Sequence, residues 1–441
     1  MSVRSRTLYL AGLSAAMLFA APSLTLSIAQ AGSSGADGTA WNQWRGPDRD
    51  GLSKETGLSK DWETQRPKLL WMSDRMGTGY AGLAIADGRI FTTGNSDGGQ
   101  AVVAANQEDG KVIWRRVLTD QVPKHGYQGS RCTPTVDGDR LFVMLSDGTI
   151  ACLQTDDGKV VWKRHAKDWN GKMMSSWGYS ESPLVDGNKV IVTPGGPDAM
   201  MVALNKRTGK EIWKSAVPNL GDNGKDGAGY SSAIISNGAG VKQYVQLTGR
   251  GLIGVRAKDG KFLWGYNPVA NPTANIPTPI ASGDYVFGTS GYGTGAALLK
   301  LSRAPRGGVK AEEVYFLPAK TFQNHHGGVL LVGDHLYAGH KHNNGFPICL
   351  DMKSGDVVWG GDIRGPGKGS AAVLYADGHL IFRYQDGTLA LIEATPEEYR
   401  LKGTLKPAFQ ERESWSHPVI VDGKLYLREQ DKLMCYDLKE S

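Results

Sequence analysis

The residues with the clearest potential for chemistry are four histidines in two short clusters. His325 and His326 begin one predicted β-strand, and His340 and His342 end the next strand along the chain. Antiparallel neighbours bring such strand ends side by side, so three imidazoles could hold zinc or copper and leave one position open. Alternation along a strand, however, sends adjacent residues to opposite faces, and no carboxylate stands nearby in the sequence to orient the rings. The pattern favours structural or solvent-facing roles over a metal site.

Other catalytic templates are weaker. Ser130, Ser180 and Ser414 lie near predicted strand starts without the G-x-S-x-G turn of a nucleophilic serine. The glycine-rich segment 291–295 has no helix after it and no lysine, as a phosphate-binding loop would need. These patterns assign no catalytic residue, and they favour a protein that is not an enzyme.

A repeat of eleven residues organises the chain around these candidates. Each copy has a small residue, a polar residue two positions later, a turn that closes on Gly, two apolar residues and a Trp. Copies occupy 104–114, 152–162, 203–213, 254–264 and 349–359. The pattern predicts a strand end, a tight turn in which Gly takes a conformation that other residues resist, and a return strand with an aromatic anchor.

A second recurring element precedes each copy, a short strand that ends in Val-Asp-Gly or its like and continues into an apolar strand. Asp-Gly turns between β-branched runs predict hairpins, so one unit comprises four strands. Units begin near Tyr80, Ser130, Tyr179, Tyr230, Ile276, His325, Gly369 and Ser414. The fifth unit, with an insertion at 302–309 and Tyr315 or Phe316 at the Trp position, and the seventh are degenerate. A closed array of small sheets explains how 441 residues form a single body.

The two ends of the chain predict how this array closes. The eighth unit stops after its third strand, at 435–438, whereas residues 67–74 present a lone outer strand with Trp71. The N-terminal strand is therefore expected to complete the last unit and leave no unpaired edge. The predicted fold is all-β, an eight-bladed β-propeller of four-stranded antiparallel blades over residues 67–441. Six tryptophans are expected to pack between blades: Trp71, Trp114, Trp162, Trp213, Trp264 and Trp359.

The N-terminal segment predicts export. Residues 1–31 combine Arg4 and Arg6, a short apolar stretch and a small-residue cleavage site, as in a secretory signal peptide; the alternative is an uncleaved anchor. No Cys precedes Cys132, so the cleavage region offers no thiol for lipid attachment. The mature chain is expected to be periplasmic or secreted, with no transmembrane span. Residues 32–66 are expected to form a lead-in linker whose tryptophans pack on the propeller.

Cysteines and charge narrow the functional classes. Cys152, Cys349 and Cys435 occupy the small-residue position of the repeat, which predicts buried, reduced thiols. The formal charge is +6, but acidic and basic residues are interspersed without a basic stripe. This composition, together with export, argues against nucleic-acid binding.

The repeat resembles the tryptophan-docking motif of the pyrroloquinoline quinone (PQQ) repeat propellers. That family includes quinoprotein alcohol dehydrogenases and the outer-membrane assembly lipoprotein BamB, and the resemblance covers roughly residues 67–441. It implies an eight-bladed fold and two functions, PQQ-dependent oxidation or an assembly role at the envelope. The enzymes of the family hold PQQ with a tryptophan floor, a vicinal disulfide, a calcium ion and an aspartate base. This sequence has no adjacent cysteines, so PQQ stays possible without support from site residues.

The inner strand starts should line the mouth of the central channel, where a ligand or partner would bind. We expect a binding or assembly module of the cell envelope, non-catalytic and monomeric, whose partner is an envelope or extracellular protein or a small ligand in the funnel. The alternatives are a PQQ- or metal-dependent oxidoreductase and a carbohydrate or small-ligand sensor. The funnel candidates for ligand or cofactor contact are Trp177, Tyr179, Glu181, Tyr230, Trp415 and His417.

Overall fold

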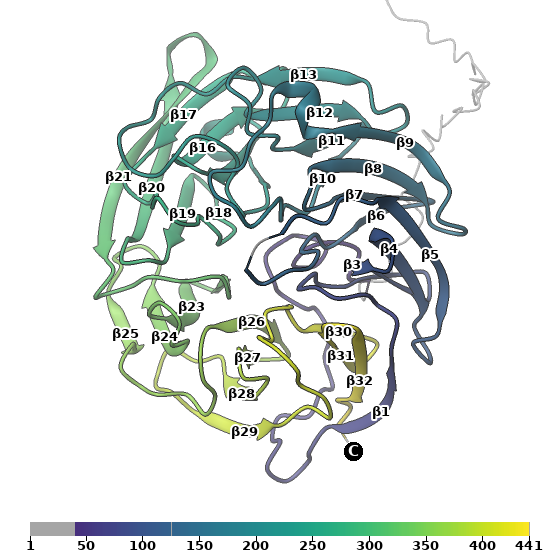
Figure 1. Ribbon diagram of the computed structural model, residues 1–441. Coiled ribbons are helices and arrows are strands. Elements are labelled where there is room, and N and C mark those ends of the chain that lie inside the picture. The colour runs from purple at the N-terminus through teal and green to yellow at the C-terminus, as the bar shows by residue number, and fades with distance from the viewer. Residues whose placement is uncertain (1–39, 125, 441) are drawn as a thin grey trace, which may run out of the picture. The chain divides into compact units, whose positions relative to one another are not determined.

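The computed structural model describes residues 40–124 and 126–440, which form eight four-stranded antiparallel sheets arranged as blades around a central hub (Figure 1). The fold is an eight-bladed β-propeller, as the sequence predicts. Three short 3₁₀ helices, η1 (Ala166–Trp169), η2 (Gly238–Gly240) and η3 (Pro305–Gly307), are the helical elements of these residues. The expected signal peptide and the first part of the expected linker lie outside the described residues.

The strands follow one another from the hub outwards in each blade. Blade 1 contains β2 (Ala84–Ala86), β3 (Arg89–Ser96), β4 (Gly99–Asn106) and β5 (Val112–Thr119), and blade 2 contains β6 (Thr135–Asp137), β7 (Arg140–Met144), β8 (Thr149–Gln154) and β9 (Val160–His165). Blade 3 contains β10 (Leu184–Asp186), β11 (Lys189–Val192), β12 (Met201–Asn205) and β13 (Glu211–Ser215), and blade 4 contains β14 (Ile234–Ser236), β15 (Gln243–Thr248), β16 (Gly251–Arg256) and β17 (Phe262–Tyr266).

The second half of the ring follows the same order. Blade 5 contains β18 (Ile280–Ser282), β19 (Tyr285–Ser290), β20 (Gly295–Ala304) and β21 (Gly308–Pro318), and blade 6 contains β22 (Val329–Val332), β23 (His335–His340), β24 (Phe346–Asp351) and β25 (Val357–Gly360). Blade 7 contains β26 (Ala371–Ala376), β27 (His379–Tyr384), β28 (Leu389–Glu393) and β29 (Leu401–Leu405), and blade 8 contains β30 (Val419–Val421), β31 (Lys424–Glu429), β32 (Lys432–Asp437) and β1 (Lys68–Ser73). The insertion expected in blade 5 lengthens the β20–β21 hairpin.

Blade 8 combines strands from the two ends of the described chain. β1 pairs antiparallel with β32, and Trp71 stands opposite Cys435. Because β1 supplies the outer strand, blade 8 has four strands like the others, and its edge carries a Trp as the outer strands of blades 1, 2, 3, 4 and 6 do.

The small residue and the Trp of each repeat face each other across the two outer strands. Cys152 pairs with Trp162 and Gly254 with Trp264. A Cβ atom added to Gly254 would lie 2.1 Å from Nε1 of Trp264, so the indole folds over its small partner. Large residues at this position would force the ring away, which explains why the repeat has Ala, Gly or Cys there.

Each of several Trp rings also covers the turn glycine of the following blade. A Cβ added to Gly158 would lie 2.6 Å from Trp114, and one added to Gly209 would lie 2.7 Å from Trp162. Trp114 and Trp162 also donate their indole N–H to backbone carbonyls of the next blade, those of Thr155 and Lys206. Trp71 covers Gly110 in the same way and so joins blade 8 to blade 1. We call these rings, Trp71, Trp114, Trp162, Trp213, Trp264 and Trp359 with Tyr315, the Trp belt.

The hydrophobic core consists of clusters between neighbouring blades. One cluster joins Phe91 and Val102 of blade 1 to Leu141 and Leu153 of blade 2, and equivalent clusters continue around the ring. All four cysteines are free and buried. No helix in residues 40–124 and 126–440 has the length and apolar character needed to cross a membrane.

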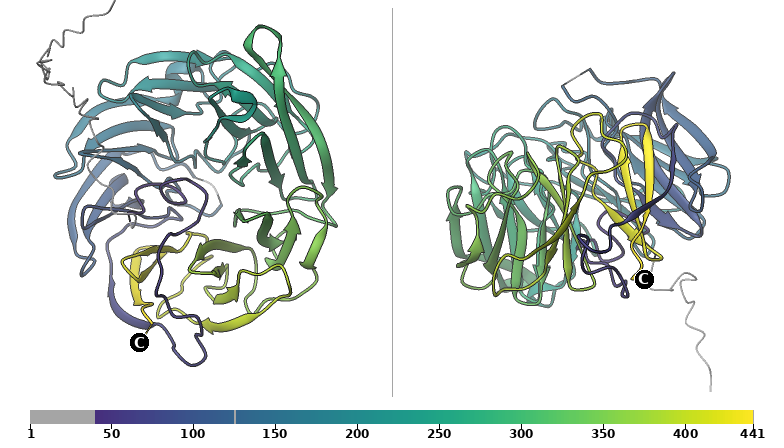
Figure 2. Two further views of the ribbon diagram at one scale, coloured as in Figure 1. Left: turned by 180° about the vertical axis from the view of Figure 1, so that it is seen from behind. Right: turned by 90° about the horizontal axis from the view of Figure 1, so that it is seen from below.

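Residues 41–55 of the expected linker form an ordered plug of the hub rather than a spacer, and residues 58–66 pack against the outer strand of blade 7 and the segment after β32. Trp41 bridges Ile85 of blade 1, Asn42 bonds to Val136 of blade 2, and Arg49 donates to the backbone carbonyls of residues 182 and 183 that lead into blade 3. Further contacts reach the opposite side of the ring, from Trp44 to Thr278, Arg45 to Val329, Ser53 to Tyr375 and Glu55 to Gly423. Hydrogen bonds therefore tie this plug to blades 1, 2, 3, 5, 6, 7 and 8. Seen from behind, it crosses the ring as a dark purple segment (Figure 2).

Candidate functional site

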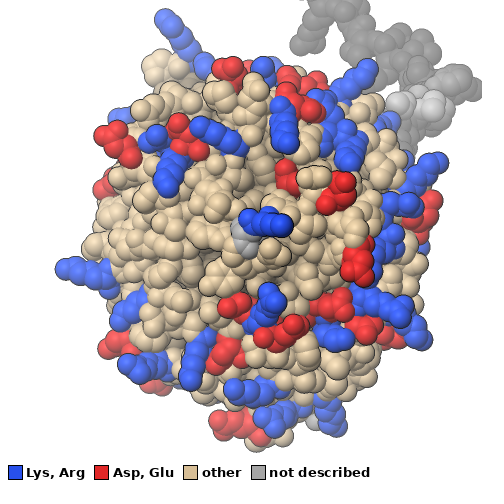
Figure 3. Space-filling view, viewed as in Figure 1, with Lys and Arg blue, Asp and Glu red and all other residues tan. Residues whose placement is uncertain are grey.

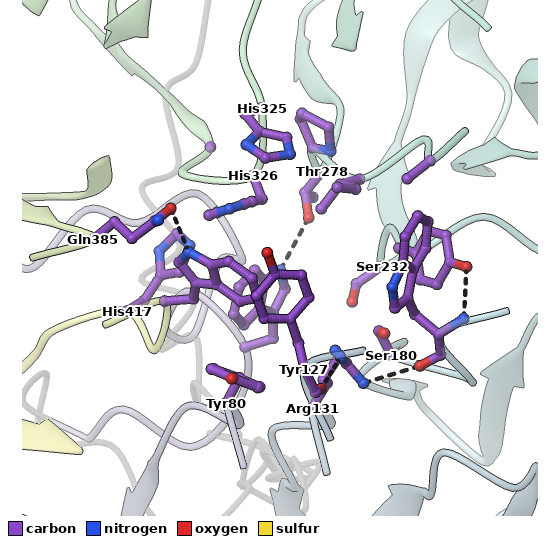
Figure 4. A pocket seen from close by; sticks show the side chains of 18 of the residues that line it. Tyr80, Tyr127, Arg131, Ser180, Ser232, Thr278, His325, His326, Gln385 and His417 are labelled. Carbon is purple, nitrogen blue, oxygen red and sulfur yellow. Dashed lines mark hydrogen bonds between the residues drawn. The ribbon is translucent and has the colours of Figure 1, made fainter. Parts of the chain in front are cut away.

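A cavity of about 360 Å³ lies in the hub. Its walls come from the segments that lead into the inner strands of the blades, and Trp44 and Arg45 of the plug form its floor. Side chains from many parts of the sequence converge there (Figure 4). A volume of this size is at the lower end of the range for small-molecule sites.

Aromatic rings form most of the upper wall. Trp415 lies 4.8 Å from Tyr80 and 4.8 Å from Tyr127, and Trp177 lies 5.9 Å from Tyr230, measured between ring centroids. Tyr292 continues this wall beside His325. Between these rings stand small polar groups, Ser180, Ser232, Thr278, Asn343 and Gln385.

Arg131 fixes the loop that carries Tyr127. Its guanidinium donates to the carbonyls of Gly129, Trp177 and Tyr127, and it lies 5.6 Å from the centre of the Tyr80 ring. Burial lowers the pKa of Arg131 to about 10, which leaves it charged at neutral pH. Both terminal nitrogens of Arg131 already donate to backbone carbonyls, so this residue holds the loop at the mouth of the cavity in place.

The floor holds polar atoms whose partners are incomplete. Arg45 is 4% exposed, and its Nη2 donates to the carbonyls of Asp50 and Val329. Its Nε and Nη1 have no hydrogen-bond partner among the described residues, nor do Nε2 of His326 and Nε2 of His417. Burying a polar group without a hydrogen bond costs free energy, so each of these groups is a candidate contact for a ligand.

Three of the four candidate metal ligands come together, but nitrogens of His325 and His342 contact protein groups. His325 lies 4.2 Å from His326 and 4.1 Å from His342 between ring centroids. Nδ1 of His325 contacts the hydroxyl of Ser370 and Nε2 contacts the hydroxyl of Tyr292, while Nδ1 of His342 accepts from the backbone N–H of Tyr292.

His340 stands apart from these three rings. It stacks on Phe322 with centroids 5.8 Å apart and accepts from the backbone N–H of Gln323. No group of three His, Cys, Asp or Glu side chains in residues 40–124 and 126–440 is arranged to hold a metal ion. His325, His326 and His342 line the cavity, whereas His340 does not.

Burial keeps these imidazoles neutral. It lowers the pKa of His326 to about 3, with His417 contributing, and the pKa of His417 to about 3, with Arg45 contributing. Burial also lowers the pKa of His340 to about 4. A neutral imidazole can donate one hydrogen bond and accept another, so the wall can adapt to either polarity.

The six funnel candidates divide into two groups. Trp177, Tyr230, Trp415 and His417 line the cavity. Tyr179 does not, because its hydroxyl donates to the carbonyl of Pro194 inside the wall. Glu181 is also outside the lining.

Glu181 is buried behind the wall in a polar network. It accepts hydrogen bonds from the backbone and hydroxyl of Thr193 and from the amide of Gln246. Burial raises the pKa of Glu181 to about 7, and the positive charge of Arg49 opposes this shift. Glu181 therefore belongs to the support of the hub and does not reach a ligand in the cavity.

Sequence reasoning missed the floor and part of the rim. Trp44 and Arg45 were expected in a lead-in, and Tyr127, Ser180, Ser232, Thr278, Asn343 and Gln385 were not singled out as contacts. The sequence feature that points to this floor is the segment W-x-x-W-R-G-P at 41–47. Its two tryptophans are unfavourable in water and should be buried, and burying them would also bury the adjacent Arg45.

The residues of the cavity do not fit a calcium–quinone centre. Calcium needs several oxygen ligands, usually including carboxylates, and neither Asp nor Glu is among the residues that line the cavity. The carboxylate of Glu413 lies 3.5 Å from the hydroxyl of Tyr80, at the back of that ring. The adjacent cysteines of the quinoprotein lid are also missing from the sequence.

Charges on the face opposite the plug are mixed. Figure 3 shows Lys, Arg, Asp and Glu interspersed around this face, with a mostly uncharged middle. This distribution provides no broad field of one sign to attract nucleic acid.

The fold and the cavity define the class, an eight-bladed β-propeller with a cavity in its hub. The family model described as outer membrane protein assembly factor BamB matches residues 60–167 and 124–361, and the chain belongs to this family. This confirms the resemblance found in the repeat.

Individual relatives agree with this assignment. BamB of Shewanella oneidensis is 23% identical over 386 residues, which is 82% of this chain and 86% of that protein. The crystal structure of BamB from Moraxella catarrhalis matches with a TM-score of 0.58 and 12% identity, covering 85% of this chain and 98% of that one. The quinohemoprotein alcohol dehydrogenase from Comamonas testosteroni matches with a TM-score of 0.62 and 12% identity, covering 91% and 81%. At these identities the structural matches show the fold alone.

Proposed function

We propose that this protein is a non-catalytic binding module of the cell envelope that receives part of its partner in the hub cavity. The observation that carries the proposal is the cavity itself, with its aromatic wall, its buried unpartnered donors and a lining that lacks carboxylates. Apolar surface with a few fixed polar groups is what a recognition site needs. Membership of the BamB family supports a place in the envelope, periplasmic or secreted.

An oxidoreductase is less well supported by the same residues. A quinone enzyme of this fold would need a calcium site and a carboxylate base against the cofactor, and the lining offers neither. His325 would have to give up its contacts with Ser370 or Tyr292 to bind a metal. Binding without chemistry requires neither change.

Site-specific crosslinking tests the proposal. Tyr127 is 47% exposed at the mouth and touches Trp415. Replacing Tyr127 with a photoreactive phenylalanine should give discrete crosslinked products when the purified protein is irradiated with a cell-envelope fraction, because a partner entering the cavity must pass this ring.

The matched control places the same photoreactive residue at Val161, which is 38% exposed on the outer strand β9. Products from position 127 that are absent at position 161 support binding at the mouth. Equal products at both positions, or none at position 127, contradict it.

A further inference from the structure

The most informative residue of the cavity is Arg45. A guanidinium that is 4% exposed would normally use all its donors, yet only Nη2 has partners among the described residues. Burial lowers the pKa of Arg45 to about 10, with Asp50 opposing the shift, so the group is charged at neutral pH. The lining of the cavity therefore includes a cation, two of whose nitrogens are buried and unpaired among the described residues.

The surroundings of Arg45 leave room for this cation and do not neutralise it at the cavity. A Cβ added to Gly328 would lie 2.1 Å from Nη1 of Arg45, so glycine there opens the space that the guanidinium occupies. The same position lies 3.5 Å from Cε1 of His417. Asp50 is the carboxylate closest in sequence, but Arg45 bonds to its backbone carbonyl, and the Asp50 side chain accepts from the N–H of Leu52.

A neutral imidazole also lines the cavity. Nε2 of His326 has no partner among the described residues, and in the tautomer that carries its proton on Nε2 it could donate to an oxyanion, as Arg45 could. His417 lines the same cavity, but its ring already bonds to the backbone at residues 326 and 373, so it is not counted as a donor to the oxyanion. Charge-assisted hydrogen bonds of this kind are stronger than those between neutral groups.

The upper wall indicates what carries the oxyanion. The aromatic pairs around Trp415 are tilted by 37° with Tyr80, 58° with Tyr127 and 62° with His326. These rings do not form a parallel slot for a flat ring system. Apolar faces in several directions, separated by hydroxyl and amide groups such as Ser232, Thr278 and Gln385, suit a pyranose ring, whose C–H faces pack on aromatic rings while its hydroxyls bond at the edges.

We propose that the hub cavity binds an acidic saccharide, with a sugar ring against the Trp415 wall and a carboxylate or sulfate ester at Arg45. This inference rests on the proposed binding function and names its ligand class. The cavity volume of about 360 Å³ admits one or two sugar rings. Arg45 supplies the preference for an anion, and the tilted aromatic wall supplies the affinity for the ring.

Pairs of sugars that differ in one charged group test the proposal on the unmodified protein. Methyl β-D-glucuronide and methyl β-D-glucoside differ by a carboxylate, and glucose 6-sulfate and glucose differ by a sulfate ester. Isothermal titration calorimetry should give, in at least one pair, a Kd for the acidic sugar that is at least tenfold lower than that for its neutral counterpart. The pair with the larger ratio tells which oxyanion the site prefers, and inorganic sulfate alone should bind more weakly than the sulfated sugar.

Variants connect the preference to Arg45. Arg45→Gln should reduce the acidic-to-neutral ratio to about one, and Arg45→Lys, which keeps the charge, should retain part of it. Lys54→Gln is the matched control, because Lys54 carries a positive charge in the same plug but is exposed and paired with Asp48. Circular dichroism and the melting temperature show whether each variant is folded.

Two outcomes overturn the proposal. Equal affinity of the unmodified protein for both members of each pair, or no binding of any of the sugars, rules out an acidic saccharide, and this result does not depend on any variant. A folded Arg45→Gln protein that keeps the preference removes Arg45 from the site. Crosslinking from position 127 could still succeed in either case, so the binding function and its ligand class fail separately.

Discussion

The Trp belt and the hub of the same ring are built on opposite plans. In the belt, one contact recurs, because a Trp ring covers the turn glycine of the next blade at Gly110, Gly158, Gly209 and Gly260. In the hub, each blade contributes a different residue, such as Arg131, Tyr230, His326 and Trp415. The repeated contact holds the blades together, and the varied residues make a site.

This difference separates stability from specificity. A belt contact buries an aromatic ring against the backbone of the next blade, and this burial stabilises the folded state whether or not a ligand is bound. The hub retains charged and polar atoms without partners, Arg45 and His417 among them, which costs stability and provides recognition. Substitutions in the belt should therefore change the free energy of unfolding, and substitutions in the hub should change binding and pH dependence.

The largest expected effect is that of Trp213→Ala in the belt. The Trp213 ring is 8% exposed, covers Gly260 and stacks on Tyr244 with centroids 6.0 Å apart. Removing it should lower the free energy of unfolding by about 3–5 kcal/mol, because the cavity cannot collapse between two rigid sheets. Chemical denaturation measures this loss.

Ile212 provides the control from the same strand. It is 42% exposed, so Ile212→Ala should change the free energy of unfolding by at most about 0.5 kcal/mol. A loss below about 1 kcal/mol for Trp213→Ala would mean that the belt does not hold the blades together.

A pair of glycine substitutions isolates the contact between blades. Gly209 has φ of 68° and Gly187 has φ of 60°, so Ala is strained by a similar amount at both turns. A Cβ at Gly209 would meet Trp162 at 2.7 Å, whereas one at Gly187 would meet nothing within 4 Å. Gly209→Ala should therefore cost about 1–3 kcal/mol more than Gly187→Ala in the same denaturation experiment. Equal losses would show that the turn conformation alone selects this glycine.

The belt could be predicted from the sequence because its physical cause is periodic. A small residue opposite Trp, an Asp-Gly turn and alternating apolar residues recur at fixed spacing, and each copy reinforces the prediction of the others. The degenerate fifth blade could also be predicted, because Tyr315 stands at the Trp position of the repeat. In the structure its ring lies 3.0 Å from a Cβ added to Gly355, the turn glycine of the next blade. The lone strand at 67–74 could be assigned because an incomplete sheet elsewhere needed it.

The hub could be predicted only in part because nothing in it repeats. The starts of the inner strands pointed to Trp177, Tyr230, Trp415 and His417, and the structure places these four in the lining of the cavity. Alternation could not tell which way Tyr179 and Glu181 turn, because the segments before these short strands are irregular. The sequence does not predict that the plug forms the floor of the cavity. Trp44 and Arg45 bond to residues more than 200 positions away, and no local pattern in residues 43–47 indicates such distant partners.

The last expected effect concerns the pH dependence of the hub. Burial raises the pKa of Glu181 from 4.5 to about 7 in the folded protein. The folded state therefore binds a proton more tightly than the unfolded state. The stability that protonated Glu181 contributes to the folded state is fully present below pH 4.5 and is lost as the pH rises through about 7. The aromatic rings of the Trp belt do not titrate between pH 5 and pH 8, so the stability that they contribute should not change over this pH range.

Glu181→Gln tests this assignment because it removes the titration and keeps the shape of the side chain. The difference in free energy of unfolding between Glu181→Gln and the unmodified protein should shift in favour of the variant by about 2–3 kcal/mol between pH 5 and pH 8. The constant part of the difference reports the altered hydrogen bonds to Thr193 and Gln246, and only the pH-dependent part reports burial of the charge. If the difference is the same at both pH values, Glu181 is ionised throughout and Arg49 neutralises it, and the hub is then no more sensitive to pH than the belt.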